Sequence, residues 1–205
     1  MPPLLGVLIS YLAGSIPFAY LAGKARGVDL RKHGSGNLGA SNAVRVLGPG
    51  IGGLVYICDT LKGLLPVLLL PPRIDSSNPE LWAIAFGLAA VLGHVRPIFL
   101  LGKGGGKGVA TSGGVFLGLA WLPTLISAAV FIIVLGLFRI SSVASLSAAV
   151  TLPLAILVSV GPQSPLFVMS LAVLALVIWT HRSNIRRLRR GEEPRIGRKA
   201  EVSAQ

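Results

Sequence analysis

The sequence predicts an all-α integral membrane protein with seven transmembrane helices, one or more of them short, with its N-terminus outside and its C-terminus in the cytoplasm. Composition is the first reason: the 205 residues are 53% hydrophobic and only 13% charged, with a mean hydropathy of +0.76. A soluble domain carries roughly 25% charged residues. Bilayer-length apolar runs are the second reason, and the positions of the cations are the third. We expect one transmembrane domain over residues 1–205, with a basic cytoplasmic tail from about residue 182.

Six apolar segments define the expected spans. The first follows Met1 without a basic region ahead of it, so we interpret it as a span rather than a cleaved signal. The fourth is too long for one ordinary span and too short for two full ones, and Trp121 and Pro123 mark a turn near its middle. A short span followed by a fuller one gives seven helices; six, with one long tilted helix, is the alternative. The segments are Leu4–Ala22, Ile51–Leu70, Leu81–Leu101, Val109–Leu137, Val143–Val160 and Leu166–Thr180.

Lysine and arginine residues decide the orientation. They gather after the first segment, around the end of the third, at Arg139 and after the last, whereas residues 71–80 and 161–165 carry almost none. The positive-inside bias puts all the basic segments in the cytoplasm. A six-helix count would leave either the region of Lys107 or Arg139 on the wrong side, which favours seven. Topology thus accounts for the formal net charge of +12, and we expect no nucleic-acid partner because no long basic domain is present.

Four polar segments fall on this one face: residues 34–42, 102–108, 139–142 and 181–184. The first reads Gly-Ser-Gly-Asn-Leu-Gly-Ala-Ser-Asn, between basic residues. Its glycines let backbone N–H groups approach an anion, and Ser and Asn add donors; a flexible connector is the alternative. The formal GxGxxG match is not a dinucleotide site, because no strand precedes it and Asp59 lies in an apolar helix, paired with Lys62.

The second polar segment reads Gly-Lys-Gly-Gly-Gly-Lys-Gly and leads into a helix that begins at Val109. It is not a Walker A loop, since Gly108 stands where that motif has Ser or Thr. A glycine-rich turn at a helix N-terminus, with Lys107 beside it, still indicates a phosphate site. A flexible hinge is the alternative.

The other polar positions are less specific. His181 and Asn184 are three residues apart and share a helix face, Ser142 lies in a turn that resembles a helix N-cap, and Glu192 and Glu193 could anchor the tail by ion pairs. His94, Arg96, Asp59 and Lys62 are ionisable groups in or near the spans, which default to the bundle interior. The sequence does not separate structural from catalytic roles for them.

The sequence lacks the motifs typical of metal sites and of nucleophilic serine hydrolases. The chain contains no CxxC or HExxH pattern and no GxSxG elbow, so we expect no metal site. No histidine has the aspartate partner that many acyltransferases use. The single cysteine, Cys58, excludes an internal disulfide.

Three motifs in order resemble a known family, the bacterial acyl-phosphate:glycerol-3-phosphate acyltransferases of the PlsY type. The resemblance covers essentially the whole chain. The first motif is Gly34–Asn42 with Arg45. The second runs from Gly93-His94 through Gly105-Gly-Lys107-Gly-Val-Ala-Thr111. The third is His181-Arg-Ser-Asn184-Ile185, Arg187-Leu188, Gly191 and Glu193.

Two positions depart from the family pattern. Ser41 stands where Thr is usual. The stretch between Leu100 and Gly105 is one residue longer and lacks the customary aromatic, which leaves open whether Lys103 or Lys107 acts; we choose Lys107 because Gly-Val-Ala-Thr follows it.

The resemblance implies a multi-pass enzyme of the bacterial cell (inner) membrane with its active site facing the cytoplasm. It implies transfer of a fatty acyl group from a long-chain acyl phosphate to the sn-1 hydroxyl of glycerol 3-phosphate, giving lysophosphatidic acid and phosphate, the first acylation of phospholipid synthesis. We expect direct attack, without an acyl-enzyme or cofactor, and an acyl chain that lies between helices in the lipid. Whether a soluble acyl-phosphate synthase docks on the basic face is left open.

Both substrates of that reaction are phosphates, so two anion sites are needed. We expect Lys107 and the helix start on one phosphate and Arg45, Ser35, Asn37 and Ser142 on the other, although which loop holds which phosphate is open. His181 is the candidate general base, with a phosphate oxygen of the donor as the alternative. The expected catalytic residues are Ser35, Lys107, His181 and Asn184; the expected phosphate-binding residues are Gly36, Asn37, Asn42, Arg45, Gly105, Gly106, Gly108, Val109, Thr111 and Ser142.

Two other classes of protein share some of these features. A transporter for a phosphate-bearing solute also uses glycine-rich half-helix starts, but the two halves of the chain show no repeat. A non-catalytic lipid-binding scaffold is the second rival, and turnover without a partner would exclude it.

Overall fold

The computed structural model describes residues 1–196; the regular elements in that range are helices joined by loops, and none is a strand. The helices are α1 Pro3–Ser15, α2 Phe18–Ala25, α3 Ala40–Leu47, α4 Pro49–Leu69, α5 Pro79–Val95, α6 Val109–Leu119, α7 Trp121–Phe138, α8 Ser141–Val160, α9 Pro165–Thr180 and α10 Arg182–Arg189. Short 3-10 turns at Pro71–Arg73 and Ile98–Leu100 follow α4 and α5.

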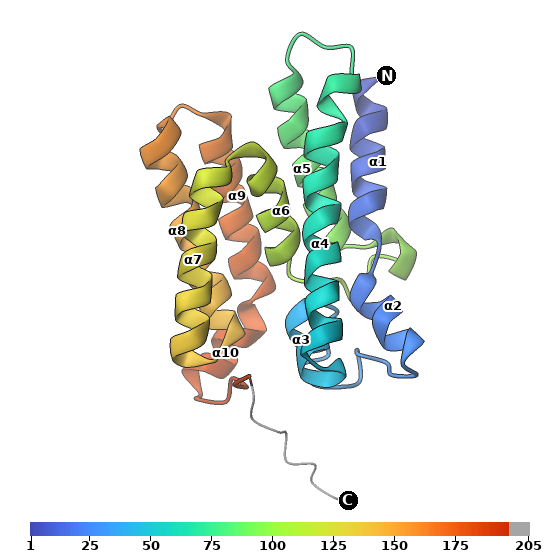
Figure 1. Ribbon diagram of the computed structural model, residues 1–205, viewed down its shortest axis with the longest axis vertical. Helices are drawn as coiled ribbons and strands as arrows, with labels where there is room; N and C mark the ends of the chain where they lie inside the picture. Colours follow the sequence, from blue (N-terminus) through green and yellow to red (C-terminus); the bar gives the residue numbers. More distant parts are fainter. Residues whose placement is uncertain (197–205) are drawn as a thin grey trace, which may run out of the picture.

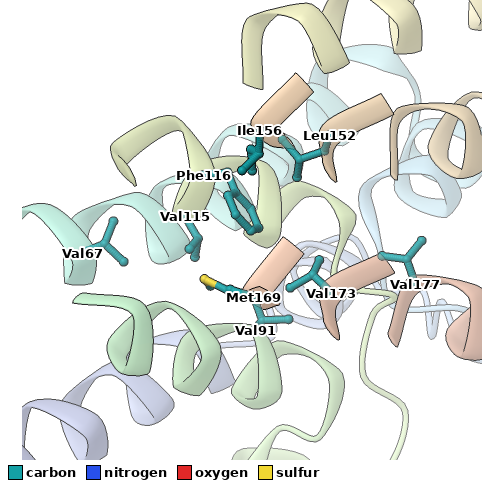
Figure 2. Close-up of a cluster of buried hydrophobic side chains, with 9 residues drawn as sticks. All are labelled: Val67, Val91, Val115, Phe116, Leu152, Ile156, Met169, Val173 and Val177. Atoms are coloured by element: carbon teal, nitrogen blue, oxygen red, sulfur yellow. The ribbon is translucent and has the colours of Figure 1, made fainter. Parts of the chain in front are cut away.

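The long helices form two groups with α6 between them. Helices α1, α4 and α5 lie on one side and α7, α8 and α9 on the other (Figure 1). A buried cluster joins the groups, with side chains from α4, α5, α6, α8 and α9 around Phe116 (Figure 2). The short α6 therefore lies in the packed interior.

Glycines let α6 approach α4 closely. A Cβ on Gly63 would lie 2.1 Å from the carbonyl oxygen of Thr111, and a Cβ on Gly114 would lie 1.9 Å from that of Thr60. Small residues at such contacts are the usual means of close helix packing in membranes. This contact fixes the start of α6, which directly follows the polar segment of residues 102–108.

The expected break in the fourth apolar segment is confirmed. Helix α6 ends at Leu119 and α7 begins at Trp121. Among residues 1–196, five helical stretches are long and apolar enough to cross a membrane, or six if the bent pair α9 and α10 forms one span. With 11 residues, α6 is about 16 Å long, shorter than a hydrocarbon core of about 30 Å. The length and composition of the helices in residues 1–196 are thus those of a multi-pass membrane protein, while the number of spans stays a prediction.

Candidate active site

The four polar segments meet at one end of the bundle. They line a cavity of about 320 Å³ near α3, α10 and the loop before α6, at the end of the molecule where α3 and α10 lie in Figure 1. The predicted site residues on its wall are Ser35, Asn37, Asn42, Arg45, Lys107, Gly108, Val109, Ser142, His181 and Asn184. Segments far apart in the sequence therefore build one polar surface.

Asn42 shapes the first loop. Its Oδ1 accepts a hydrogen bond from the Ser35 N–H at 2.8 Å, and its Nδ2 donates to the carbonyl oxygens of Leu30 and His33. The side chain is 2% exposed, so its amide is used within the loop. This internal scaffold presents Ser35 to the cavity.

Lys107 reaches the cavity and Lys103 does not. Lys107 Nζ donates to Asn184 Oδ1, and the Thr180 hydroxyl donates to the Lys107 carbonyl oxygen at 3.1 Å. Burial, with smaller contributions from nearby arginines, lowers the pKa of Lys107 to about 8. Lys103 is exposed and absent from the cavity wall. Gly108, at φ +88°, turns the chain into α6.

Four predicted binding residues lie outside this wall. Gly36 occupies a left-handed turn at φ +69° beside the Arg31 carbonyl. The Gly105 carbonyl accepts from Asn37 Nδ2 at 3.3 Å, and the Gly106 N–H donates to the His94 carbonyl at 3.1 Å. Thr111 is fully buried in α6 against α4. The hydrogen of the Gly106 amide is thus bonded within the protein, and phosphate binding by Gly106 stays a prediction.

His181 lies at the junction of α9 and α10, where the axes bend by 58°. It is 2% exposed. Its Nδ1 lies 2.8 Å from the Val177 carbonyl oxygen, a geometry that assigns the proton of the neutral ring to Nδ1 and leaves Nε2 as an acceptor. Burial, and secondarily the charge of Lys107, lowers the pKa of His181 to about 4. The imidazole is neutral at physiological pH.

Glu193 is the main residue of the cavity that the sequence did not assign to the site. Its carboxylate accepts from the Ser142 hydroxyl at 2.7 Å, from Arg187 Nε at 2.7 Å and from Asn184 Nδ2. Burial alone would raise the pKa of the Glu193 carboxyl, but these hydrogen bonds hold it below its usual value. Of the ion pairs expected for Glu192 and Glu193, the one made by Glu193 is present, with Arg187 of α10. The one feature of the sequence that could have pointed to Glu193 is that it is an acid in a strongly basic tail.

The cavity combines three cations with two acids. Arg45, Lys107 and Arg187 line it together with Glu193 and Asp59. The Arg45 Nε is buried without a hydrogen-bond acceptor in the described part of the chain, and burial lowers the pKa of this guanidinium. Excess positive charge with hydroxyl and amide donors suits a phosphate dianion. Residues 1–196 hold no cluster of three or more His, Cys, Asp or Glu that could bind a metal.

A second cavity of about 340 Å³ adjoins the first. It is mainly apolar and lies among α4, α6, α7, α8 and α9. Tyr56, Val109, Phe131 and Ser145 belong to both cavities. A cavity lined by charged and hydrogen-bonding groups thus borders a more apolar cavity. This arrangement suits a molecule with a charged head and a hydrocarbon tail.

The chain is similar to known proteins over nearly its full length. A family model described as glycerol-3-phosphate acyltransferase matches residues 4–191. A glycerol-3-phosphate acyltransferase from Prochlorococcus marinus strain NATL1A is 45% identical over 198 residues, covering 95% of this chain and 98% of the relative. One from Geobacter sulfurreducens is 47% identical over 189 residues, covering 92% and 94%.

Two solved structures are similar in fold. Crystal structures of PlsY, described as an integral membrane glycerol 3-phosphate acyltransferase, superpose with TM-scores of 0.88 for a glycerol 3-phosphate form and 0.85 for a lysophosphatidic acid form. Their sequence identities to this chain are 40% and 39%. The first match covers 95% of this chain and 96% of the other. The second covers 95% of both.

Proposed function

This chain belongs to the glycerol-3-phosphate acyltransferase family and is an acyltransferase, and from that premise we propose that its acyl donor is a long-chain acyl phosphate. In the proposed reaction the sn-1 hydroxyl oxygen of glycerol 3-phosphate attacks the acyl carbonyl carbon directly. The new ester bond forms, the bond from the carbonyl carbon to the phosphate oxygen breaks, and lysophosphatidic acid and phosphate leave. No acyl-enzyme and no cofactor take part.

The observation that carries this proposal is the meeting of Arg45, Lys107, Ser142, His181 and Asn184 around one cavity that opens onto an apolar one. Both substrates carry phosphate, which cationic and hydroxyl groups bind well. The relatives named above bind glycerol 3-phosphate and lysophosphatidic acid according to their descriptions. The apolar cavity fits the acyl chain.

Catalysis by this site is mainly positioning and charge stabilisation. Lys107, with Gly108 and the start of α6 at Val109, binds one phosphate. Arg45, Ser35 and Ser142 bind the other. A mixed anhydride is already activated, which is why direct attack suffices without a covalent intermediate.

The attacking hydroxyl loses its proton to one of two acceptors. His181 Nε2 is free to accept it, since Nδ1 is bonded to the Val177 carbonyl. A pKa of about 4 makes His181 a weak base, so a phosphate oxygen of the donor is the stronger candidate on basicity. In that case His181 and Asn184 orient the hydroxyl.

The donor assignment has a direct test. The purified protein in lipid nanodiscs is given glycerol 3-phosphate with either acyl phosphate or acyl-CoA, and lysophosphatidic acid is measured by mass spectrometry. We expect product with acyl phosphate alone, and phosphate release matching ester formation one to one. Product from acyl-CoA alone would overturn the donor assignment while leaving the family activity intact.

We further propose that the chain crosses the bacterial inner membrane seven times with its active site facing the cytoplasm. The support is the basic character of the segments around the cavity. A Cys58→Ser variant with single cysteines introduced at Ser164 or at Arg190 tests this in intact cells. A membrane-impermeant thiol reagent should label position 164 and not position 190; the reverse pattern would refute the orientation.

A further inference from the structure

Three ionisable side chains are buried together beside the glycine-rich loop of residues 102–108, called the glycine loop below. The proposed reaction uses none of them. Asp59 and Lys62 lie one turn apart on α4, and His94 lies near the end of α5; they are 2%, 6% and 6% exposed. Lys62 Nζ lies 2.7 Å from Asp59 Oδ1, and His94 Nδ1 lies 3.6 Å from the same oxygen. Charged groups at such depth are costly, and persist where they have a function.

His94 supports the glycine loop with both its backbone and its ring. Its carbonyl oxygen accepts the Gly106 N–H at 3.1 Å. A Cβ on Gly106 would lie only 2.1 Å from His94 Nε2, so the imidazole edge lies against the glycine. The His94 ring thus lies between Asp59 on its Nδ1 side and Gly106 on its Nε2 side.

The other end of the cluster contacts the first predicted span, which the structure divides into α1 and α2. Lys62 Nζ donates to the Ile16 carbonyl oxygen at 2.8 Å, at the break between α1 and α2. Pro17 follows that carbonyl and has no N–H to contribute. The three side chains thus connect the first span, α4 and α5 to the loop.

Lys107 directly follows Gly106 and is held on its other side by Thr180, whose hydroxyl bonds to the Lys107 carbonyl. We propose that Asp59 and His94 are positioning residues that seat Gly106 and thereby fix Lys107 in the phosphate-binding cavity. Gly106 then acts as a support surface rather than as a phosphate ligand. This inference rests on the proposed role of Lys107.

A size-compensation experiment tests the contact. Gly106 lies outside the left-handed region, and the three atoms nearest to a Cβ there all belong to the His94 ring, whereas a Cβ on Gly105 would lie 2.2 Å from the Val95 carbonyl oxygen. We expect His94→Ala and Gly106→Ala each to lower kcat/KM for glycerol 3-phosphate by about 10- to 100-fold, because small displacements of a charged group are costly.

Two double variants distinguish a direct contact between His94 and Gly106 from independent effects of the two substitutions. His94→Ala with Gly106→Ala should lose no more than the worse single variant, because the methyl group occupies vacated space. His94→Ala with Gly105→Ala should show the two losses multiplied, because that clash is with backbone atoms. Multiplied losses in the first pair, or near-normal activity of His94→Ala, would overturn the proposal.

Hydrogen exchange gives a readout independent of turnover. Amides of residues 102–108 should exchange faster in His94→Ala and in the isosteric Asp59→Asn, measured by mass spectrometry well below the melting temperature. Unchanged exchange in Asp59→Asn would refute its positioning role even if His94→Ala does not fold. The kinetic cycle uses whichever donor the enzyme turns over, so failure of the donor assignment remains distinguishable from failure of this inference.

Discussion

Replacing Lys107 by Met removes one cation from the candidate phosphate site with little change in volume. A charge-assisted hydrogen bond contributes about 1.5–3 kcal/mol, and two unit charges 4 Å apart interact by about 4 kcal/mol at an effective dielectric constant of 20. We therefore expect a loss of about 2–4 kcal/mol of transition-state stabilisation. At 1.36 kcal/mol for each factor of ten, kcat/KM falls by roughly 30- to 900-fold.

Lys103→Met is the matched control. It lies in the same loop and removes the same charge, but its side chain is exposed and absent from the cavity wall. We expect a change below about threefold, as for most exposed charges. Both variants are assayed for lysophosphatidic acid formation in nanodiscs near pH 7. Equal losses, or a Lys107→Met enzyme within about threefold of the parent, would refute the assignment of Lys107.

Four further outcomes are expected. His181→Ala should lower kcat by on the order of 100-fold with folding retained; near-normal turnover would remove His181 from the catalytic residues. The pH profile of kcat/KM should rise through about pH 4 as His181 loses its proton and fall above about pH 8 as Lys107 loses its own, since the neutral imidazole and the charged amine are the active forms; a profile flat up to pH 10 would contradict the role of Lys107. Glu193→Gln should move the alkaline limb to lower pH, because the Glu193 charge raises the pKa of Lys107, and an unmoved limb would argue against this coupling. Gly63→Ala should destabilise the protein by about 1–3 kcal/mol by forcing α4 from α6, seen as a lower melting temperature, whereas Gly136→Ala, which has open space around it, should not.

Sequence patterns predicted much of this molecule because they arise from local physics. The apolar runs specify membrane helices through the bilayer itself, and Pro123 near Trp121 marked the break that separates α6 from α7. Glycines before Val109 marked a helix start suited to an anion. Motif spacing identified the family, since the resemblance depends on residue types rather than on contacts.

Other features depend on which helices pack together. Nothing in the order of residues showed that Glu193 accepts from both Ser142 and Asn184. The sequence favoured Lys107 over Lys103, but only the geometry put Lys107 on the cavity wall and showed that the Gly106 N–H is bonded to the His94 carbonyl. A pattern of glycines predicts that a loop can bind an anion, but only neighbouring groups decide which amides are left free.

By itself, the sequence determined a multi-pass membrane acyltransferase with glycine-rich polar segments, because hydropathy, charge bias and motif chemistry are properties of the chain alone. The tertiary structure decided how those segments share one cavity, since contacts across distant helices follow from side-chain packing. It also decided that Asp59, Lys62 and His94 are buried together and which groups they contact. Both His94 and His181 are buried, so their partners, which no local pattern encodes, are what distinguish a supporting histidine from a reacting one.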